Sequence, residues 1–248
     1  MIVLKSRDEV EIMRRAGRVV ARTLDLVGRE IKPGMTTAEL DALIEEFIRS
    51  EGAIPAFKNY QGYPGSACVS IDDEVVHGIP GKRVIKDGEI VSVDVGSIVD
   101  EFYGDSARTF AIGEISPEKA KLMEYTQKAL MAGIDKARKD NKLGAISEAV
   151  QNVAESQGYG VVRQLVGHGI GRKMHEEPQV PNFGSANEGP VLKTGMVIAI
   201  EPMINMGTYE VKTMPDGWTV VTADGQPSAH FEHTVAITDN GPDILTLS

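Results

Sequence analysis

The sequence predicts an α+β fold built from two similar halves, each with two helices followed by a set of strands. Two amphipathic helical segments open the chain, and a Gly-rich, strand-like stretch follows from about residue 55 to 112. Two more helical segments and further Gly-punctuated strands then repeat this order. No Pro/Ser-rich linker separates the halves. We therefore expect one domain over residues 1–248, with pseudo-symmetric halves near 1–112 and 113–248.

The first helix is predicted to begin at Ser6, where Glu9 three residues later completes a capping-box pattern. Helical spacing then continues through Val10, Met13, Gly17, Val20, Leu24 and Val27. The segment KPGMT ends this helix, and Thr36 with Glu39 opens a second one. The apolar face of the second helix comprises Leu40, Leu43, Ile44, Phe47 and Ile48.

A third helix is predicted to begin at SPEKAKLMEY, with Ser116 as its cap and Pro117 in its first turn. A fourth covers roughly residues 143–156. In the strand-like stretch between the helical pairs, VSVDV places Asp94 and the valines on opposite faces of a strand. The next strand, GDSARTF, lies across a turn, so antiparallel neighbours can present Asp94 and Asp105 side by side.

Composition and charge exclude several classes of protein. The net charge of −10 disfavours nucleic acid as the main ligand, because phosphate binding requires concentrated Lys and Arg. The single cysteine, Cys68, allows no internal disulfide and fits a reducing compartment. The N-terminus lacks the apolar region of a signal peptide, and no apolar run approaches the ~20 residues of a membrane helix. We expect a cytoplasmic protein with no membrane partner.

Several carboxylates lie within apolar, strand-like segments. Asp94 is the only charge in IVSVDVGSIV, Glu201 follows four apolar residues in VIAIEPM, and Glu232 lies in HFEHTVAI. A buried carboxylate that has no partner costs several kcal/mol, so such groups are paired, neutralised or metal-bound. These segments contain no Lys or Arg, but all five histidines lie on or next to them: His77, His168, His175, His230 and His233.

Each of these residues alone has an ordinary structural explanation. A strand Asp is usually at an edge, a Glu before Pro can end a strand, and a lone His is more often a core residue than a ligand. Together, four acids and a histidine on short apolar strands favour a metal site. This oxygen-rich set suits Mn, Fe(II), Co or Mg better than a structural zinc site. Five ligands are also more than one ion needs, so the set favours a pair of ions. Paired divalent ions activate water for hydrolysis.

Five segments follow one another along nearly the whole chain: EVVHGIP, VDVGSIVDEFYGDSART, GHGIGRKMHEEP, IAIEPM and HFEHT. In order and spacing they resemble the type I methionine aminopeptidases of the M24 metallopeptidase family. The resemblance implies the pita-bread fold and two divalent ions per chain, of cobalt, manganese, iron(II), zinc or magnesium. The short interval between His168 and Glu201 leaves no room for the helical insert of type II. The N-terminus lacks the zinc-finger extension of eukaryotic type I enzymes.

The resemblance also implies roles for individual residues. Asp94 would chelate the first ion, His168 and Glu201 the second, and Asp105 and Glu232 would bridge both. The catalytic residues would be His77, His175 and Glu201, the two histidines contacting substrate and Glu201 passing a proton to the leaving amine. The methionine pocket would draw on Tyr60, Tyr63, Cys68, Trp218, Phe57 and Met174. The family usually has Gln where this chain has His230.

The expected activity is removal of N-terminal methionine from nascent proteins and peptides, with preference for a small second residue. Two alternatives are a pita-bread hydrolase that cleaves X-Pro bonds and a non-catalytic pita-bread binding protein.

A separate question concerns Arg14, Arg18 and Arg22, which lie one helical turn apart beside Arg15. They form either a solvated face balanced by acids or a transient docking stripe for the ribosome. Members of the family are mostly monomers, so we expect a monomer.

Overall fold

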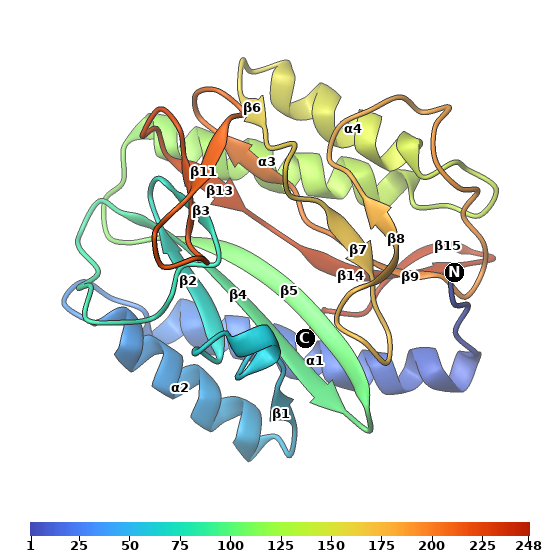
Figure 1. Ribbon diagram of the computed structural model, residues 1–248, viewed down its shortest axis with the longest axis horizontal. Coiled ribbons are helices and arrows are strands. Elements are labelled where there is room, and N and C mark those ends of the chain that lie inside the picture. Colours follow the sequence, from blue (N-terminus) through green and yellow to red (C-terminus); the bar gives the residue numbers. More distant parts are fainter.

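The computed structural model covers residues 1–248 and confirms the α+β class. Helices α1 (Arg7–Glu30) and α2 (Thr37–Ser50) lie along one side of the strands, and α3 (Pro117–Lys136) and α4 (Gly144–Glu155) lie along the opposite side (Figure 1). All four predicted helices are therefore confirmed, and their starts lie within one residue of the prediction.

The predicted helix starts have clear physical causes. Ser6 and Glu9 form a complete capping box: the Glu9 backbone N–H donates to Ser6 Oγ at 3.2 Å, and the Ser6 N–H donates to Glu9 Oε2 at 2.9 Å. Thr36 and Glu39 do the same for α2. Ser116 caps α3 with Pro117 in the first turn. Helix α4 has no side-chain cap.

The strands pair antiparallel in four sheets. The sheet beside α1 and α2 comprises β1 (Ile54–Pro55), β2 (Ala67–Ile71), β4 (Ile90–Val99) and β5 (Phe102–Ala111). The largest sheet has the order β15 (Gly241–Ile244), β14 (His233–Thr238), β9 (Val197–Ile200), β7 (Gly167–Gly169) and β8 (Glu176–Val180).

Two three-stranded sheets connect these larger ones. One has the order β13 (Ser228–His230), β10 (Met203–Asn205) and β6 (Gly160–Val161). The other has the order β11 (Val211–Thr213), β12 (Val220–Thr222) and β3 (Glu74–Val76). A short 3-10 helix, η1 (Tyr60–Gly62), interrupts the loop between β1 and β2.

Each pair of helices packs on its own apolar core. The buried faces of α1 and α2 contact β2 and β4, while α3 and α4 pack on β9, β10 and β14. Helix α1 approaches β5 closely because Gly17 and Gly104 meet there: a Cβ on Gly104 would lie 2.7 Å from the Gly17 backbone nitrogen. The division of residues 1–248 into halves near 1–112 and 113–248 stays a prediction.

The arginine-rich face of α1 is largely ion-paired. Arg14 contacts Asp243 at 2.6 Å and Glu11 at 3.1 Å, and Arg15 contacts Asp100 at 2.6 Å. These contacts match the charge-balanced face that the sequence allows, and a ribosome contact stays a prediction. None of the helices combines the length and the apolar character that crossing a membrane requires.

Candidate active site

Two neighbouring strands carry the first two predicted metal ligands on one face. In the antiparallel β4–β5 pair, Asp94 lies opposite Ala107, and Asp105 lies opposite Gly96. The two aspartates are therefore diagonal neighbours whose side chains point to the same side of the sheet. The sequence alternation predicted this shared face, and the register adds that they are diagonal rather than directly opposite.

The other three predicted ligands come from the facing sheet. His168 lies on β7, Glu201 directly follows β9, and Glu232 directly precedes β14. Strands β9 and β14 are paired, with Ile200 opposite His233, so the two glutamates lie near each other. The Glu232 N–H donates to the carbonyl of Ala107 on β5 at 2.9 Å, which joins this sheet to the one that carries the aspartates.

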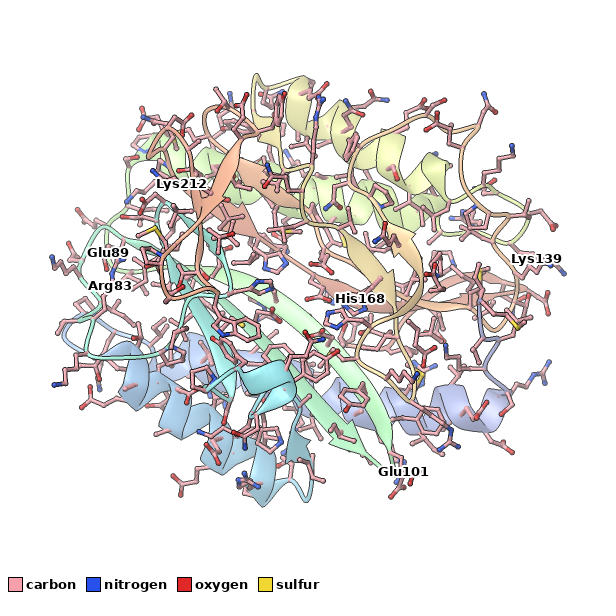
Figure 2. The ribbon with its side chains drawn as sticks, viewed as in Figure 1. Arg83, Glu89, Glu101, Lys139, His168 and Lys212 are labelled. Carbon is pink, nitrogen blue, oxygen red and sulfur yellow. The ribbon has the colours of Figure 1, made fainter.

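The five side chains converge in the middle of the molecule. Ligand atoms of Asp105, His168 and Glu232 all lie within 4.8 Å of one another. His168 Nε2 is 3.6 Å from Glu201 Oε1 and 3.9 Å from Asp105 Oδ2. His168 points inward between the two sheets, whereas the labelled Glu101, Lys139 and Lys212 lie at the periphery (Figure 2). No Lys or Arg forms an ion pair with any of these carboxylates.

The donor set fits divalent cations on the evidence of its unpaired atoms. Asp94 Oδ1, Asp105 Oδ1 and Glu232 Oε1 are buried and accept no hydrogen bond from the protein. A buried, unpaired carboxylate oxygen is costly unless a cation coordinates it. The Nδ1 atom of His168 lies 2.9 Å from the Gly169 carbonyl, which favours a proton on Nδ1 and leaves Nε2 free as a ligand. The cluster is therefore suited to hold divalent cations.

Protons compete with metal at this site, which leads to a pH prediction. Burial raises the pKa values of Asp94, Asp105, Glu201 and Glu232 above their usual range, and neighbouring carboxylates raise those of Asp94, Glu201 and Glu232 further. These groups therefore retain protons in the metal-free protein at a pH where free carboxyls are ionised. Burial lowers the pKa of His168 to about 4, so its ring is already neutral near pH 7. A binding cation must displace carboxyl protons only.

Metal affinity is expected to rise with pH, by about tenfold per pH unit for each proton displaced, up to the raised pKa values. Calorimetric titration of Mn²⁺ at two pH values, in buffers of different ionisation enthalpy, measures both the affinity and the protons released. An affinity that does not change between pH 6 and pH 8, with no proton release, would contradict the account of the site.

An apolar pocket adjoins the carboxylates within the same cavity, which has a volume of about 260 Å³. All thirteen predicted site residues line this cavity. Eight of them are the predicted substrate contacts: Phe57, Tyr60, Tyr63, Cys68, His77, Met174, His175 and Trp218. The Tyr63 and Trp218 rings meet edge to face at 5.1 Å between centroids. Burial and the neighbouring Asp94 raise the pKa of the Cys68 thiol, so Cys68 forms pocket wall and is not an activated nucleophile. The individual roles of these residues stay predictions.

The two non-ligand histidines flank the cluster. His175 Nδ1 is hydrogen-bonded to the Tyr60 hydroxyl at 2.8 Å, which fixes its ring beside His168 at 4.4 Å between centroids. His77 has a backbone φ of 60°, a left-handed conformation that non-glycine residues seldom adopt and that is enriched at functional sites. Burial and proximity to His175 lower the pKa of His77 to about 4, so it is neutral near pH 7.

The cavity also has walls that the sequence motifs did not identify. They are Gln61, Val76, Leu165, Val166 and Met203. Val76 lies within the segment EVVHGIP and Met203 within IAIEPM, while Leu165 and Val166 directly precede GHGIGRKMHEEP. This proximity to the motifs was the only available signal. Gly96 has an indirect role: a Cβ there would lie 2.8 Å from the Phe57 ring, so glycine leaves room for the pocket wall.

Comparison with known proteins agrees with this geometry. The model of metallopeptidase family M24 matches residues 11–239. The chain is 56% identical to the methionine aminopeptidase of Clostridium acetobutylicum, over 100% of this chain and 99% of that one. It is 52% identical to methionine aminopeptidase 1 of Bacillus subtilis, over 99% of both. A crystal structure of methionine aminopeptidase from Rickettsia prowazekii superposes with a TM-score of 0.98 at 44% identity, with full coverage of both chains. A prolidase from Pyrococcus furiosus shares the fold, with a TM-score of 0.82 at 24% identity over 66% of its length.

Proposed function

The chain belongs to metallopeptidase family M24, and we propose that it is an aminopeptidase that removes the N-terminal methionine from peptides and nascent proteins, with preference for a small second residue. One observation carries the proposal: a cluster of metal-ligating carboxylates and an apolar pocket share a single cavity. A pocket of that kind selects an apolar first side chain while the cluster lies beside the bond to be cleaved.

We propose that the site holds two divalent ions. Asp94 would hold one, His168 and Glu201 the other, and Asp105 and Glu232 would bridge them. Such ions, when bound, activate water and polarise a carbonyl for hydrolysis. The donor set admits cobalt, manganese, iron(II), zinc or magnesium, since carboxylate oxygens and one imidazole suit them all.

The remaining chemistry falls to the protein's own side chains. The free α-amine of a peptide would bind at the metal site, which would place the first peptide bond, and no later one, at the reacting position. His175, held by Tyr60, would donate to the oxygen that becomes negative in the transition state. His77 would contact the nitrogen of the scissile bond, and Glu201 would carry a proton to it as it leaves.

The methionine pocket gives a specificity prediction. Replacement of Trp218 by alanine removes the ring that packs against Tyr63 and opens one wall. We expect kcat/KM for Met-Ala-Ser to fall by about tenfold or more, mainly through KM, because the lost contacts hold the side chain in ground and transition states alike. Tyr209→Ala is the control, since Tyr209 is an exposed aromatic outside the cavity. Equal effects of both variants would contradict the pocket assignment.

The decisive test of the proposed function compares Met-Ala-Ser with Ala-Pro-Ala as substrates. Release of methionine is expected from the first and no cleavage from the second. Activity is expected to disappear on chelation and return when metal is added back. Cleavage of Ala-Pro-Ala instead would support the X-Pro alternative, and binding of metal without hydrolysis of either peptide would support a non-catalytic protein.

We also propose that the protein acts in the cytoplasm as a monomer, on the N-termini of nascent chains. A transient ribosome contact would then use a surface other than the ion-paired face of α1, since Arg14 and Arg15 are already matched by acids.

A further inference from the structure

His230 is a buried histidine that the proposed mechanism does not use. It ends β13 and is 1% exposed. Its backbone is fixed by β5: the His230 N–H donates to Thr109 Oγ1 at 3.0 Å, and Thr109 Oγ1 lies 2.8 Å from the His230 carbonyl oxygen. The backbone of His230 is therefore fixed on β5, and the residue does not line the cavity.

The ring nitrogen Nε2 of His230 is buried and has no hydrogen-bond partner. It lies 3.9 Å from Glu201 Oε2, while Glu201 Oε1 lies 3.6 Å from His168 Nε2. The two oxygens of Glu201 are thus divided: one faces the ligand His168 and the other faces His230. A movement of about 1 Å brings Nε2 and Oε2 within hydrogen-bond range. A neutral imidazole with its proton on Nε2 is a suitable donor.

We propose that His230 is a positioning residue for Glu201, donating a hydrogen bond from Nε2 to Oε2 so that Oε1 is presented to the ion shared with His168. This inference rests on the proposed metal site. It satisfies two groups at once, because it gives the buried Nε2 a partner and orients a carboxylate that has no Lys or Arg beside it. Loss of a group that hydrogen-bonds a metal ligand typically costs about 10–100-fold in metal affinity.

Two amide substitutions at His230 test whether a donor at the position of Nε2 is sufficient or the imidazole ring itself is required. The side-chain nitrogen of glutamine can occupy the position of Nε2, whereas that of asparagine reaches only as far as Nδ1. His230→Gln is therefore expected to retain most of the metal affinity and His230→Asn to lose about 10–100-fold. His230→Leu, which has no donor, should resemble His230→Asn. The readouts are calorimetric titration with Mn²⁺ and the visible absorption spectrum of the Co²⁺-loaded protein, whose bands report ligand geometry.

His233→Leu is the matched control. It removes a neighbouring imidazole that is half-buried, whose Nδ1 atom is hydrogen-bonded to Thr246 Oγ1 at 2.8 Å. This variant is expected to bind metal with unchanged affinity and spectrum. Thermal melting of every metal-free variant establishes that it is folded before titration.

Equal affinities and spectra for His230→Asn, His230→Leu and the wild type would overturn the proposal. Equal losses in His230→Gln and His230→Asn would overturn it too, because they would show that the imidazole itself is required. The test does not depend on peptide hydrolysis. A wild-type protein that binds metal but releases no methionine would refute the proposed function and leave the role of His230 to be decided by the titrations.

Discussion

Replacement of Glu232 by alanine is expected to abolish both metal binding and peptide hydrolysis. Glu232 lies at the centre of the cluster, with its ligand atom within 4.8 Å of those of Asp105 and His168, and its Oε1 has no partner in the protein. Loss of a group that merely hydrogen-bonds a ligand costs about 10–100-fold in metal affinity. Loss of a carboxylate that bridges two ions should therefore cost more. Metal content after dialysis and methionine release from Met-Ala-Ser measure the two effects.

Asp105→Ala is expected to behave in the same way, since Asp105 is proposed to bridge the same ions from the opposite sheet. Glu210→Ala serves as control for both, because it removes an exposed carboxylate that does not line the cavity. A Glu232→Ala protein that is free of metal and fully active would contradict the assignment of the site.

Replacement of His77 by alanine is expected to leave metal binding intact and to lower kcat by about 10²–10⁴-fold, the usual contribution of a group that handles a proton or a hydrogen bond in the transition state. His77 lines the cavity but is not among the clustered ligand atoms. Its left-handed backbone, with φ of 60°, shows that the fold maintains an unfavourable conformation at this position.

The effect of His77→Ala on catalysis is separated from any effect on metal binding by measuring metal stoichiometry and kcat in the same preparation. His77→Ala should bind as much Mn²⁺ as the wild type and melt at a similar temperature. A loss of metal that parallels the loss of rate would reassign His77 to the ligands. An unchanged kcat would remove it from the catalytic residues.

The buried acidic cluster could be predicted from the sequence because the physical conflict is visible without a structure. Asp94, Glu201 and Glu232 each interrupt an apolar segment that contains no Lys or Arg, so each required a partner. The helices could be predicted for a similar local reason, since their capping residues and apolar periodicity lie within a few positions of one another.

Long-range features could not be predicted in this way. The diagonal placement of Asp94 and Asp105 depends on the β4–β5 register, which the turn geometry sets. The pocket residues Val76, Leu165 and Met203 come from β3, the loop before β7 and β10, and each is an ordinary apolar residue in its own segment. The positions of these residues around one cavity follow only from the packing of the sheets.

The central claim is that cations neutralise the acidic groups enclosed between the two sheets. The most direct measurement is an anomalous difference map from crystals of the protein loaded with Mn²⁺. The account predicts two peaks ~3.5–4 Å apart, surrounded by Asp94, Asp105, His168, Glu201 and Glu232. A map with no peak among these five side chains, or with manganese bound only elsewhere, would contradict it.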